Sequence, residues 1–263
     1  MNQKQGKNKK RCLGGILLLL LIFAGCGKEA QETVEPHGKN RFAPIVIENV
    51  AVKNLAGILQ EETGSIVVQI RTEYCVGSGV LWEITETEMI LITAGHVLEG
   101  AESLNITFRS VQKEEEEEVT VALEGAQWEL RQWESCDLGL IRIPLTVLPD
   151  ILPEHCMRPA VERSAFDHLK NGDALVVVGS DREAAGSAFE GTLTDPWIYM
   201  EDYEQYMMLA HTYARPGMSG GAVFQENGCL VGILSGADQE GNLAMVPLPI
   251  ILTELEAMDL WAE

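Results

Sequence analysis

A serine enclosed by glycines constrains this chain more than any other feature. Residues 215–224 read RPGMSGGAVF, so Ser219 lies in a glycine-rich turn that leads directly into an apolar, strand-like segment. Glycines on both sides let the backbone turn sharply and approach a ligand closely. Such a turn exposes the Ser219 hydroxyl and directs the amides of Gly217 and Ser219 at one point, as an oxyanion in acyl transfer requires. The alternative interpretation is a glycine-rich hairpin turn with an incidental serine.

Two segments upstream supply the side chains that a serine nucleophile needs. The apolar segment 91–97 (LITAGHV) contains His96, and the segment 136–143 (CDLGLIRI) begins an alternating strand with Asp137. A serine hydroxyl is a weak nucleophile until an imidazole accepts its proton, and a carboxylate fixes the tautomer of that imidazole. His96, Asp137 and Ser219 are therefore candidate catalytic residues.

On these motifs the sequence resembles the trypsin/chymotrypsin-like serine peptidases, and among them the protease domain of the bacterial HtrA (Deg) type. The resemblance spans about residues 50–250, and its motifs occur in the order of the family: GSGV at 77–80, TAGH at 93–96, DLGL at 137–140 and GMSGG at 217–221. It implies an all-β fold of two antiparallel six-stranded β-barrels, with the active site in the cleft between them and short N- and C-terminal helices. HtrA proteins usually append a PDZ domain, for which we expect no counterpart here.

The resemblance also implies a role for each candidate residue in a serine endopeptidase. His96 is the general base and then the general acid, Asp137 orients it, and Ser219 forms the acyl-enzyme. The amides of Gly217 and Ser219 form the oxyanion hole. The alternative is a catalytically silent protein that keeps the fold and only binds peptides or partners, since a fold does not guarantee a function.

Substrate-binding residues follow from the same resemblance. Tyr213, six residues before the nucleophile, lies at the base of the primary pocket, and Leu243 and Met245 narrow that pocket. No acidic residue occurs from 207 to 218, so we expect small or medium apolar side chains before the scissile bond, not Arg or Lys. An extended peptide would pair with the edge strand formed by Ser235, Gly236 and Ala237. His211, eight residues before Ser219, matches poorly the pocket histidine of glutamyl peptidases.

The first residues have the pattern of a bacterial lipoprotein signal. A basic start precedes the apolar run 12–24, which is too short for an ordinary membrane span of about 20 residues. The run ends in the sequence FAGC, which resembles a lipobox with Cys26 as the lipidated residue, although Phe23 departs from the usual aliphatic residue. An uncleaved signal anchor is the alternative. We expect a signal peptide at 1–26, a flexible tether at 27–48 and a protease domain at 49–263, anchored to the cell membrane on its extracellular or periplasmic face.

The remaining segments predict the elements of two barrels, at about residues 62–145 and 160–250. Alternating runs separated by turns indicate strands, and the prolines within 144–153 indicate the connection between the barrels. The acidic run 114–118 is predicted to be a solvated hairpin tip because like charges repel. We expect single strands at 65–71, 75–82, 88–93, 104–108, from 119, 136–143, 174–179, 222–224, 230–235 and 243–246. We also expect a strand pair with a turn at 186–195 and a loop at 200–206. Helices are expected at 50–59 and from 247, with a helical turn at 98–101.

Composition and cysteine spacing exclude several other classes of function. The net charge of −21 disfavours nucleic acid as a partner, because its binding needs basic patches. Apart from Cys12 and Cys26, the four cysteines Cys75, Cys136, Cys156 and Cys229 permit three two-bridge connectivities, and buried free thiols are the alternative. Their separation does not match zinc-binding spacing. We expect no metal and no cofactor, and peptides or unfolded proteins as substrates; the sequence does not fix an oligomeric state.

Overall fold

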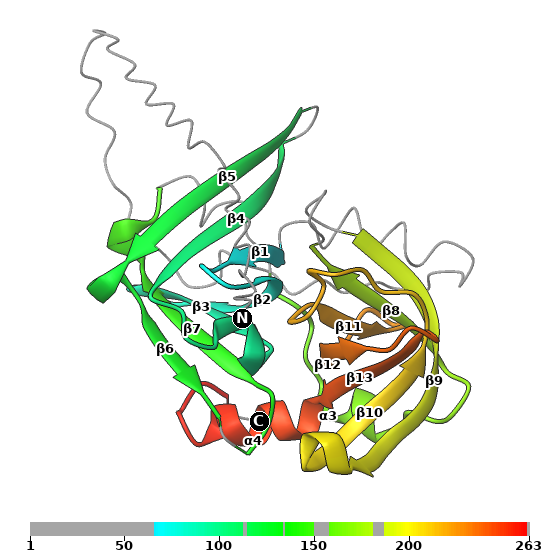
Figure 1. Cartoon of the computed structure of the whole chain (residues 1–263). Helices are drawn as coiled ribbons and strands as arrows, with labels where there is room; N and C mark the ends of the chain where they lie inside the picture. Colours follow the sequence, from blue (N-terminus) through cyan, green and yellow to red (C-terminus); the bar gives the residue numbers. More distant parts are fainter. Residues whose placement is uncertain (1–65, 113–114, 134, 150–157, 181–186, 262–263) are drawn as a thin grey trace, which may run out of the picture. The chain divides into compact units, whose positions relative to one another are not determined.

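Strands dominate the computed structural model, which describes residues 66–261 except 113–114, 134, 150–157 and 181–186 (Figure 1). The predicted helix at 50–59, the signal and the tether lie outside the described residues. None of the helices within the described part has both the length and the apolar character needed to cross a bilayer. The all-β fold class is confirmed.

The first set of strands forms a seven-stranded antiparallel sheet in the order β5-β4-β1-β2-β3-β7-β6. Within the described residues this sheet is not a closed barrel, which differs from the six-stranded barrel that we expected. The extra strand is β6, a short strand at the edge of the sheet whose four residues are all solvent-exposed. The strands are β1 Val67–Arg71, β2 Val76–Ile84, β3 Glu88–Thr93, β4 Ser103–Gln112, β5 Glu115–Glu124, β6 Glu129–Gln132 and β7 Gly139–Pro144.

The second set forms a closed six-stranded barrel in the order β10-β13-β12-β11-β8-β9, which confirms the second predicted barrel. Its strands are β8 Ala174–Gly179, β9 Ser187–Met200, β10 Gln205–His211, β11 Ala222–Gln225, β12 Leu230–Ala237 and β13 Asn242–Pro247. The helical elements of the described chain are η2 Gly95–Leu98, η3 Gly125–Gln127, η4 Leu145–Val147, α3 Arg163–Asp167, η5 Glu201–Tyr203 and α4 Leu248–Glu256.

Alternate residues of the central strands β2, β3 and β7 serve two different cores. Leu81 and Leu91 belong to a buried cluster formed by the seven-stranded sheet. Their neighbours Val80 and Ile92 belong to a second cluster that also contains residues of the barrel, such as Val178. Because successive side chains of a strand point to opposite faces, burial of both faces explains the nearly continuous apolar run of β3.

Three local predictions were wrong, one of them the loop expected at 200–206, which contains η5 and the start of β10. The acidic run is not confined to a hairpin tip, because residues 115–118 belong to β5, which pairs with β4 through the register Gln112↔Glu115, while residue 114 lies outside the described residues. The β4–β5 ladder continues through this run, so a series of like charges does not exclude a strand. The strand pair expected at 186–195 is not formed: residues 187–195 belong to the single strand β9, since Gly191 continues the ladder opposite Leu175, and residue 186 lies outside the described residues. A Cβ at position 191 would lie 2.6 Å from Thr212, which accounts for the glycine without a turn.

Candidate active site

His96 lies in the tight turn η2, which follows β3 directly. The flanking Val97 and Leu98 are completely buried, whereas the imidazole is 42% exposed. A Cβ on Gly95 would lie 3.2 Å from Oδ1 of Asp137 and 3.1 Å from the Leu138 carbonyl, so the turn packs closely against the segment that carries the aspartate. The apolar anchors of the turn therefore fix a histidine that faces solvent.

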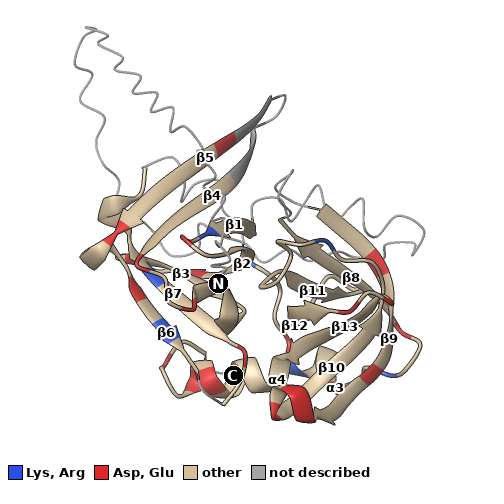
Figure 2. Ribbon diagram, in the orientation of Figure 1, with Lys and Arg blue, Asp and Glu red and all other residues tan. Residues whose placement is uncertain are grey.

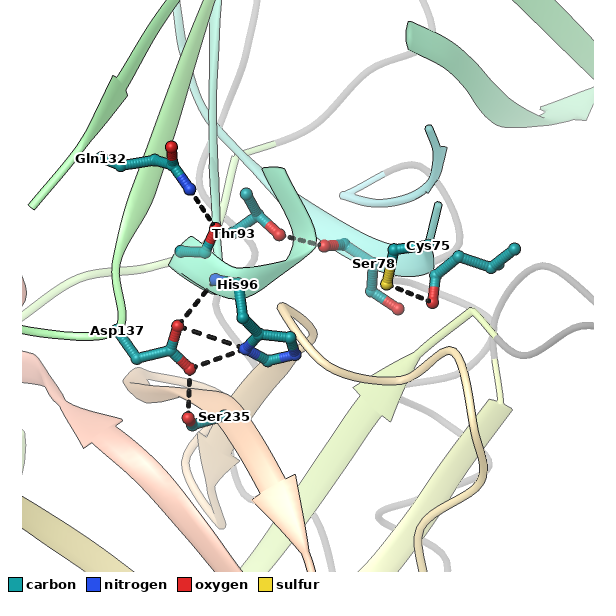
Figure 3. A network of polar contacts seen from close by, with 9 residues as sticks. Cys75, Ser78, Thr93, His96, Gln132, Asp137 and Ser235 are labelled. Carbon is teal, nitrogen blue, oxygen red and sulfur yellow. Dashed lines mark hydrogen bonds and ion pairs between the residues drawn. The ribbon is translucent and has the colours of Figure 1, made fainter. Parts of the chain in front are cut away.

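Asp137 binds His96 through both carboxylate oxygens (Figure 3). Oδ1 accepts the backbone amide of His96 at 2.9 Å, and Oδ2 contacts Nδ1 of the ring at 2.9 Å. The hydrogen bond to Asp137 raises the pKa of His96 above its ordinary value of 6.5, although partial burial opposes the charge. With Nδ1 held by the carboxylate, the ring presents its Nε2 on the side away from Asp137.

Ser235 and Gln132 complete this polar network. The Ser235 hydroxyl donates to Oδ2 of Asp137, and the Gln132 amide donates to the Gly95 carbonyl at 2.6 Å. Burial opposes the charge of the Asp137 carboxylate, but the hydrogen bonds from His96 and Ser235 outweigh it and lower the pKa of Asp137 below its ordinary range. The sequence predicts Ser235 only as part of the substrate edge, so its contact with Asp137 is a finding that no sequence signal indicated.

Ser219 lies half-buried in a turn that leads into β11. Gly217 and Gly220 have φ values of +105° and +86°, which side chains other than glycine rarely adopt. A Cβ on Gly220 would lie 2.1 Å from the Ser78 carbonyl, 2.2 Å from Oγ1 of Thr93 and 3.0 Å from the Ala94 amide. The residue after Ser219 is thus pressed against the end of β3, two or three residues before His96.

The backbone amides of this turn differ in whether they donate a hydrogen bond within the protein. The Met218 amide donates to the Arg215 carbonyl at 3.1 Å, and the Gly220 amide donates to the Leu234 carbonyl at 2.7 Å. By contrast, the amides of Gly217 and Ser219 donate to no acceptor within the described residues. These are the amides that the sequence analysis assigned to an oxyanion hole.

The edge of β12 beyond Leu234 is also free on one side. The ladder with β11 ends at Ala222↔Ile233, and the amide of Leu234 donates to the Gly221 carbonyl. Within the described strands, Gly236 and Ala237 pair only with β13. The hydroxyl of Tyr203, in η5, occupies the space into which a Cβ of Gly236 would project, at 2.6 Å.

The residues predicted to form the substrate pocket differ in burial: one is exposed and two are in the core. Tyr213 is 61% exposed, stands edge-on to Phe189 and lines a hollow of about 710 Å³ together with His211, Thr212 and Glu240. Leu243 and Met245 have no exposed surface and belong to the core that includes the barrel. No lining residue of the hollow is a member of the candidate catalytic set, so the pocket assignment of Tyr213, Leu243 and Met245 stays a prediction.

The described cysteines are free thiols: Cys136 and Cys229 are buried and Cys75 is partly exposed, while Cys156 lies outside the described residues. Burial, with a further contribution from Glu254, raises the pKa of Cys136 to about 12. No three His, Cys, Asp or Glu side chains converge as metal ligands in the described part of the chain. Acidic residues are spread over strands of both sheets, and basic ones are sparse (Figure 2).

Comparison with known proteins gives one family and one fold. Residues 77–233 match the model of the trypsin-like peptidase domain. An inactive form of Rv3671c from M. tuberculosis H37Rv superposes with a TM-score of 0.56 at 15% identity, over 83% of this chain and 99% of that one. The HtrA-type protease AlgW with a tripeptide superposes with a TM-score of 0.59 at 18% identity, over 78% of this chain and 63% of that one. A search of curated protein sequences found no significant match.

Proposed function

Since the chain belongs to the family of trypsin-like peptidase domains, we propose that it is a serine endopeptidase with His96, Asp137 and Ser219 as its catalytic triad. The contact between Asp137 and Nδ1 of His96 at 2.9 Å carries this proposal, because it sets the ring with Nε2 away from the carboxylate. A base oriented by a carboxylate is the arrangement that activates a serine.

In the proposed reaction these residues act in the order that a serine nucleophile requires, with Nε2 of His96 moving into hydrogen-bond reach of Ser219, to which no hydrogen bond joins it within the described residues. Nε2 of His96 accepts the Ser219 proton as the serine oxygen bonds to the substrate carbonyl carbon. Asp137 stabilises the imidazolium, and the free amides of Gly217 and Ser219 hold the oxyanion. His96 then gives its proton to the leaving amine as the C–N bond breaks. A water molecule, deprotonated by His96, attacks the acyl-enzyme, and His96 returns that proton to the Ser219 oxygen as the acid is released. Loss of one oxyanion donor typically costs about 10²–10³ in rate.

An extended peptide is the substrate that the edge of β12 favours. Its main chain would add to Ser235–Ala237 by hydrogen bonds, as strand addition does elsewhere. We propose small or medium apolar side chains before the scissile bond, because the segment 207–218 offers no acid. Profiling with a mixed peptide library tests this preference, and cleavage mainly after Arg or Lys would refute it.

The proposed site of action is the outer face of the cell membrane, with the chain held there by lipid on Cys26 and with peptides or unfolded proteins as substrates. A diacylated terminus with a further amide-linked chain anchors stably, since two or more chains are needed for that. Metabolic labelling with palmitate, together with membrane fractionation of the native protein and Cys26→Ala, tests the anchor. Unlabelled, fully soluble wild type would contradict it.

Hydrolysis of a fluorogenic peptide library by purified protein tests the enzymatic proposal. We expect turnover by the wild type and loss of at least about 10³-fold with Ser219→Ala, in line with removal of a nucleophile. Equal turnover by both proteins would overturn the assignment of Ser219. No turnover by a folded wild type would favour the catalytically silent peptide-binding alternative.

A further inference from the structure

Ser78, in β2, is buried without any exposed surface and uses all of its polar groups. Its amide donates to the Ser219 carbonyl at 2.7 Å, and its carbonyl accepts from Oγ1 of Thr93 at 2.6 Å. Its hydroxyl lies 2.8 Å from the Gly217 carbonyl and accepts from the amide of Ser180 at 2.8 Å. Figure 3 shows the hydrogen bond from the Thr93 hydroxyl to the Ser78 carbonyl.

The single hydroxyl proton of Ser78 has two candidate acceptors. The Gly217 carbonyl lies at 2.8 Å and the Ser180 carbonyl at 3.2 Å. A hydroxyl has one proton to donate, and the shorter contact takes it. One side chain of the seven-stranded sheet therefore binds a carbonyl of the serine turn and an amide at the end of β8 in the barrel.

The Gly217 carbonyl is a sensitive point for such a contact. Gly217 has φ +105°, and a glycine rotates more freely than any other residue. The carbonyl lies between the amides of Gly217 and Ser219, which have no acceptor in the described residues. Ser78 holds the carbonyls of both Gly217 and Ser219, so it restricts the directions in which these two amides point.

We propose that Ser78 is a positioning residue for the oxyanion hole and that its hydroxyl orients the two amides that form the hole. The inference rests on the proposed peptidase function and goes beyond it: Ser78 touches no substrate and acts through the orientation of the Gly217 and Ser219 amides. Two neighbouring contacts support this placement, because a Cβ on Gly77 would lie 2.6 Å from Val97 in the His96 turn and 3.1 Å from the Ser219 carbonyl. The Gly77–Ser78 segment thus lies between the histidine turn and the serine turn.

Ser78→Ala tests this role through the form of the kinetic loss. A misdirected oxyanion donor lowers the rate less than the removal of that donor does. We therefore expect kcat to fall about 10- to 100-fold and KM to stay within about twofold of the wild-type value. The inhibition constant of a peptide aldehyde, whose adduct with Ser219 places an oxygen in the hole, is expected to rise by the same factor as kcat/KM falls. Ser78→Cys, with a weaker donor of similar size, is expected to be intermediate.

Thr72→Val is the matched control. The Thr72 hydroxyl is also buried and bonded to backbone, because it accepts from the amides of Tyr74 and Cys75 at 3.2 and 3.0 Å, but it serves the turn before β2. We expect a loss of thermal stability comparable to that of Ser78→Ala, with kcat and the aldehyde inhibition constant unchanged.

Three outcomes overturn the proposal. One is wild-type kcat in folded Ser78→Ala, and another is an equal loss of kcat in Thr72→Val. The third is failure of both Ser78 variants to fold while Thr72→Val folds, which would assign Ser78 to stability alone. An active wild type is measured first, so a failure of the peptidase function itself is seen separately, as absence of turnover in that protein.

Discussion

The Ser235 hydroxyl donates to Oδ2 of Asp137, the same carboxylate oxygen that contacts Nδ1 of His96. Ser235 belongs to β12 of the barrel, whereas His96 lies in η2 after β3, and Asp137 lies two residues before β7, another strand of the seven-stranded sheet. The contact therefore couples the orientation of the Asp137 carboxylate, which we propose to be catalytic, to the strand on which we propose that substrate pairs.

Ser235→Ala is expected to lower kcat/KM about tenfold, since a hydrogen bond to a charged group contributes about 1.5 kcal/mol or more. Steady-state kinetics measure the effect. Ser103→Ala is the control, because Ser103, the first residue of β4, also donates to a carboxylate, that of Glu73, and neither residue is hydrogen-bonded to a candidate catalytic residue. An equal loss in both variants would show that the Ser235 contact has no specific role.

The pH dependence of kcat/KM follows from the raised pKa of His96. The base must be neutral, so activity is expected to fall on the acid side with a midpoint above 6.5. In Asp137→Asn that midpoint is expected to move to lower pH, and kcat to fall about 10⁴-fold because the ring takes the wrong tautomer. An acid midpoint that does not move in Asp137→Asn would exclude His96 as the titrating base.

The shifted pKa values of His96 and Asp137 also predict how the stability of the fold depends on pH. A folded pKa above the unfolded one means that His96 stabilises the fold at pH below about 6.5. This contribution is lost as pH rises through the folded pKa. Asp137 has the opposite sign. Because its pKa is lowered in the folded protein, Asp137 stabilises the fold at pH above its unfolded-state pKa, and this contribution is lost as pH falls through its folded-state pKa.

Gly220→Ala and Gly172→Ala form a matched pair for the serine turn. Both glycines have positive φ, of +86° and +96°, so both alanines carry a backbone cost of about 1–2 kcal/mol. Only at Gly220 would the Cβ meet the Ser78 carbonyl and Thr93, whereas nothing lies within 4 Å at Gly172. We expect thermal denaturation and activity assays to show a much larger loss for Gly220→Ala. Similar behaviour of the two variants would contradict the close approach of Gly220 to β3.

Thiol reactivity is expected to follow burial and pKa. Cys136 is buried, with a pKa raised to about 12, whereas Cys75 is partly exposed. Because the thiolate is the reactive form, iodoacetamide at pH 8 should modify Cys75 at least about tenfold faster, as peptide mapping by mass spectrometry would show. Comparable rates in the native protein, and not only after denaturation in urea, would argue against a buried Cys136.

Local sequence patterns predicted the strands that have clear boundaries. The bounds expected for β3 and β8, 88–93 and 174–179, match the structure because apolar runs there end at turn residues. The same patterns missed β10, Gln205–His211, since Met200–Tyr206 was interpreted as a loop from its acidic and aromatic residues. Tertiary pairing with β9 and β13 decides that segment, and no local signal reports it.

The candidate site was predictable in its residue types but not in its supporting contacts. His96, Asp137 and Ser219 lie in distinctive motifs, whereas the Ser235 hydroxyl is 98 residues from Asp137 and belongs to an ordinary strand. The Ser78 hydroxyl likewise contacts a carbonyl 139 residues away. Such partners depend on how two sheets meet, which no sequence period encodes.

Covalent labelling with a fluorophosphonate, mapped to the modified residue by tandem mass spectrometry, tests the central claim most directly. For the folded wild type we predict a single adduct on Ser219, abolished in Ser219→Ala and strongly slowed in His96→Ala. A folded wild type that takes no label, or labelling that persists unchanged in Ser219→Ala, would contradict the account.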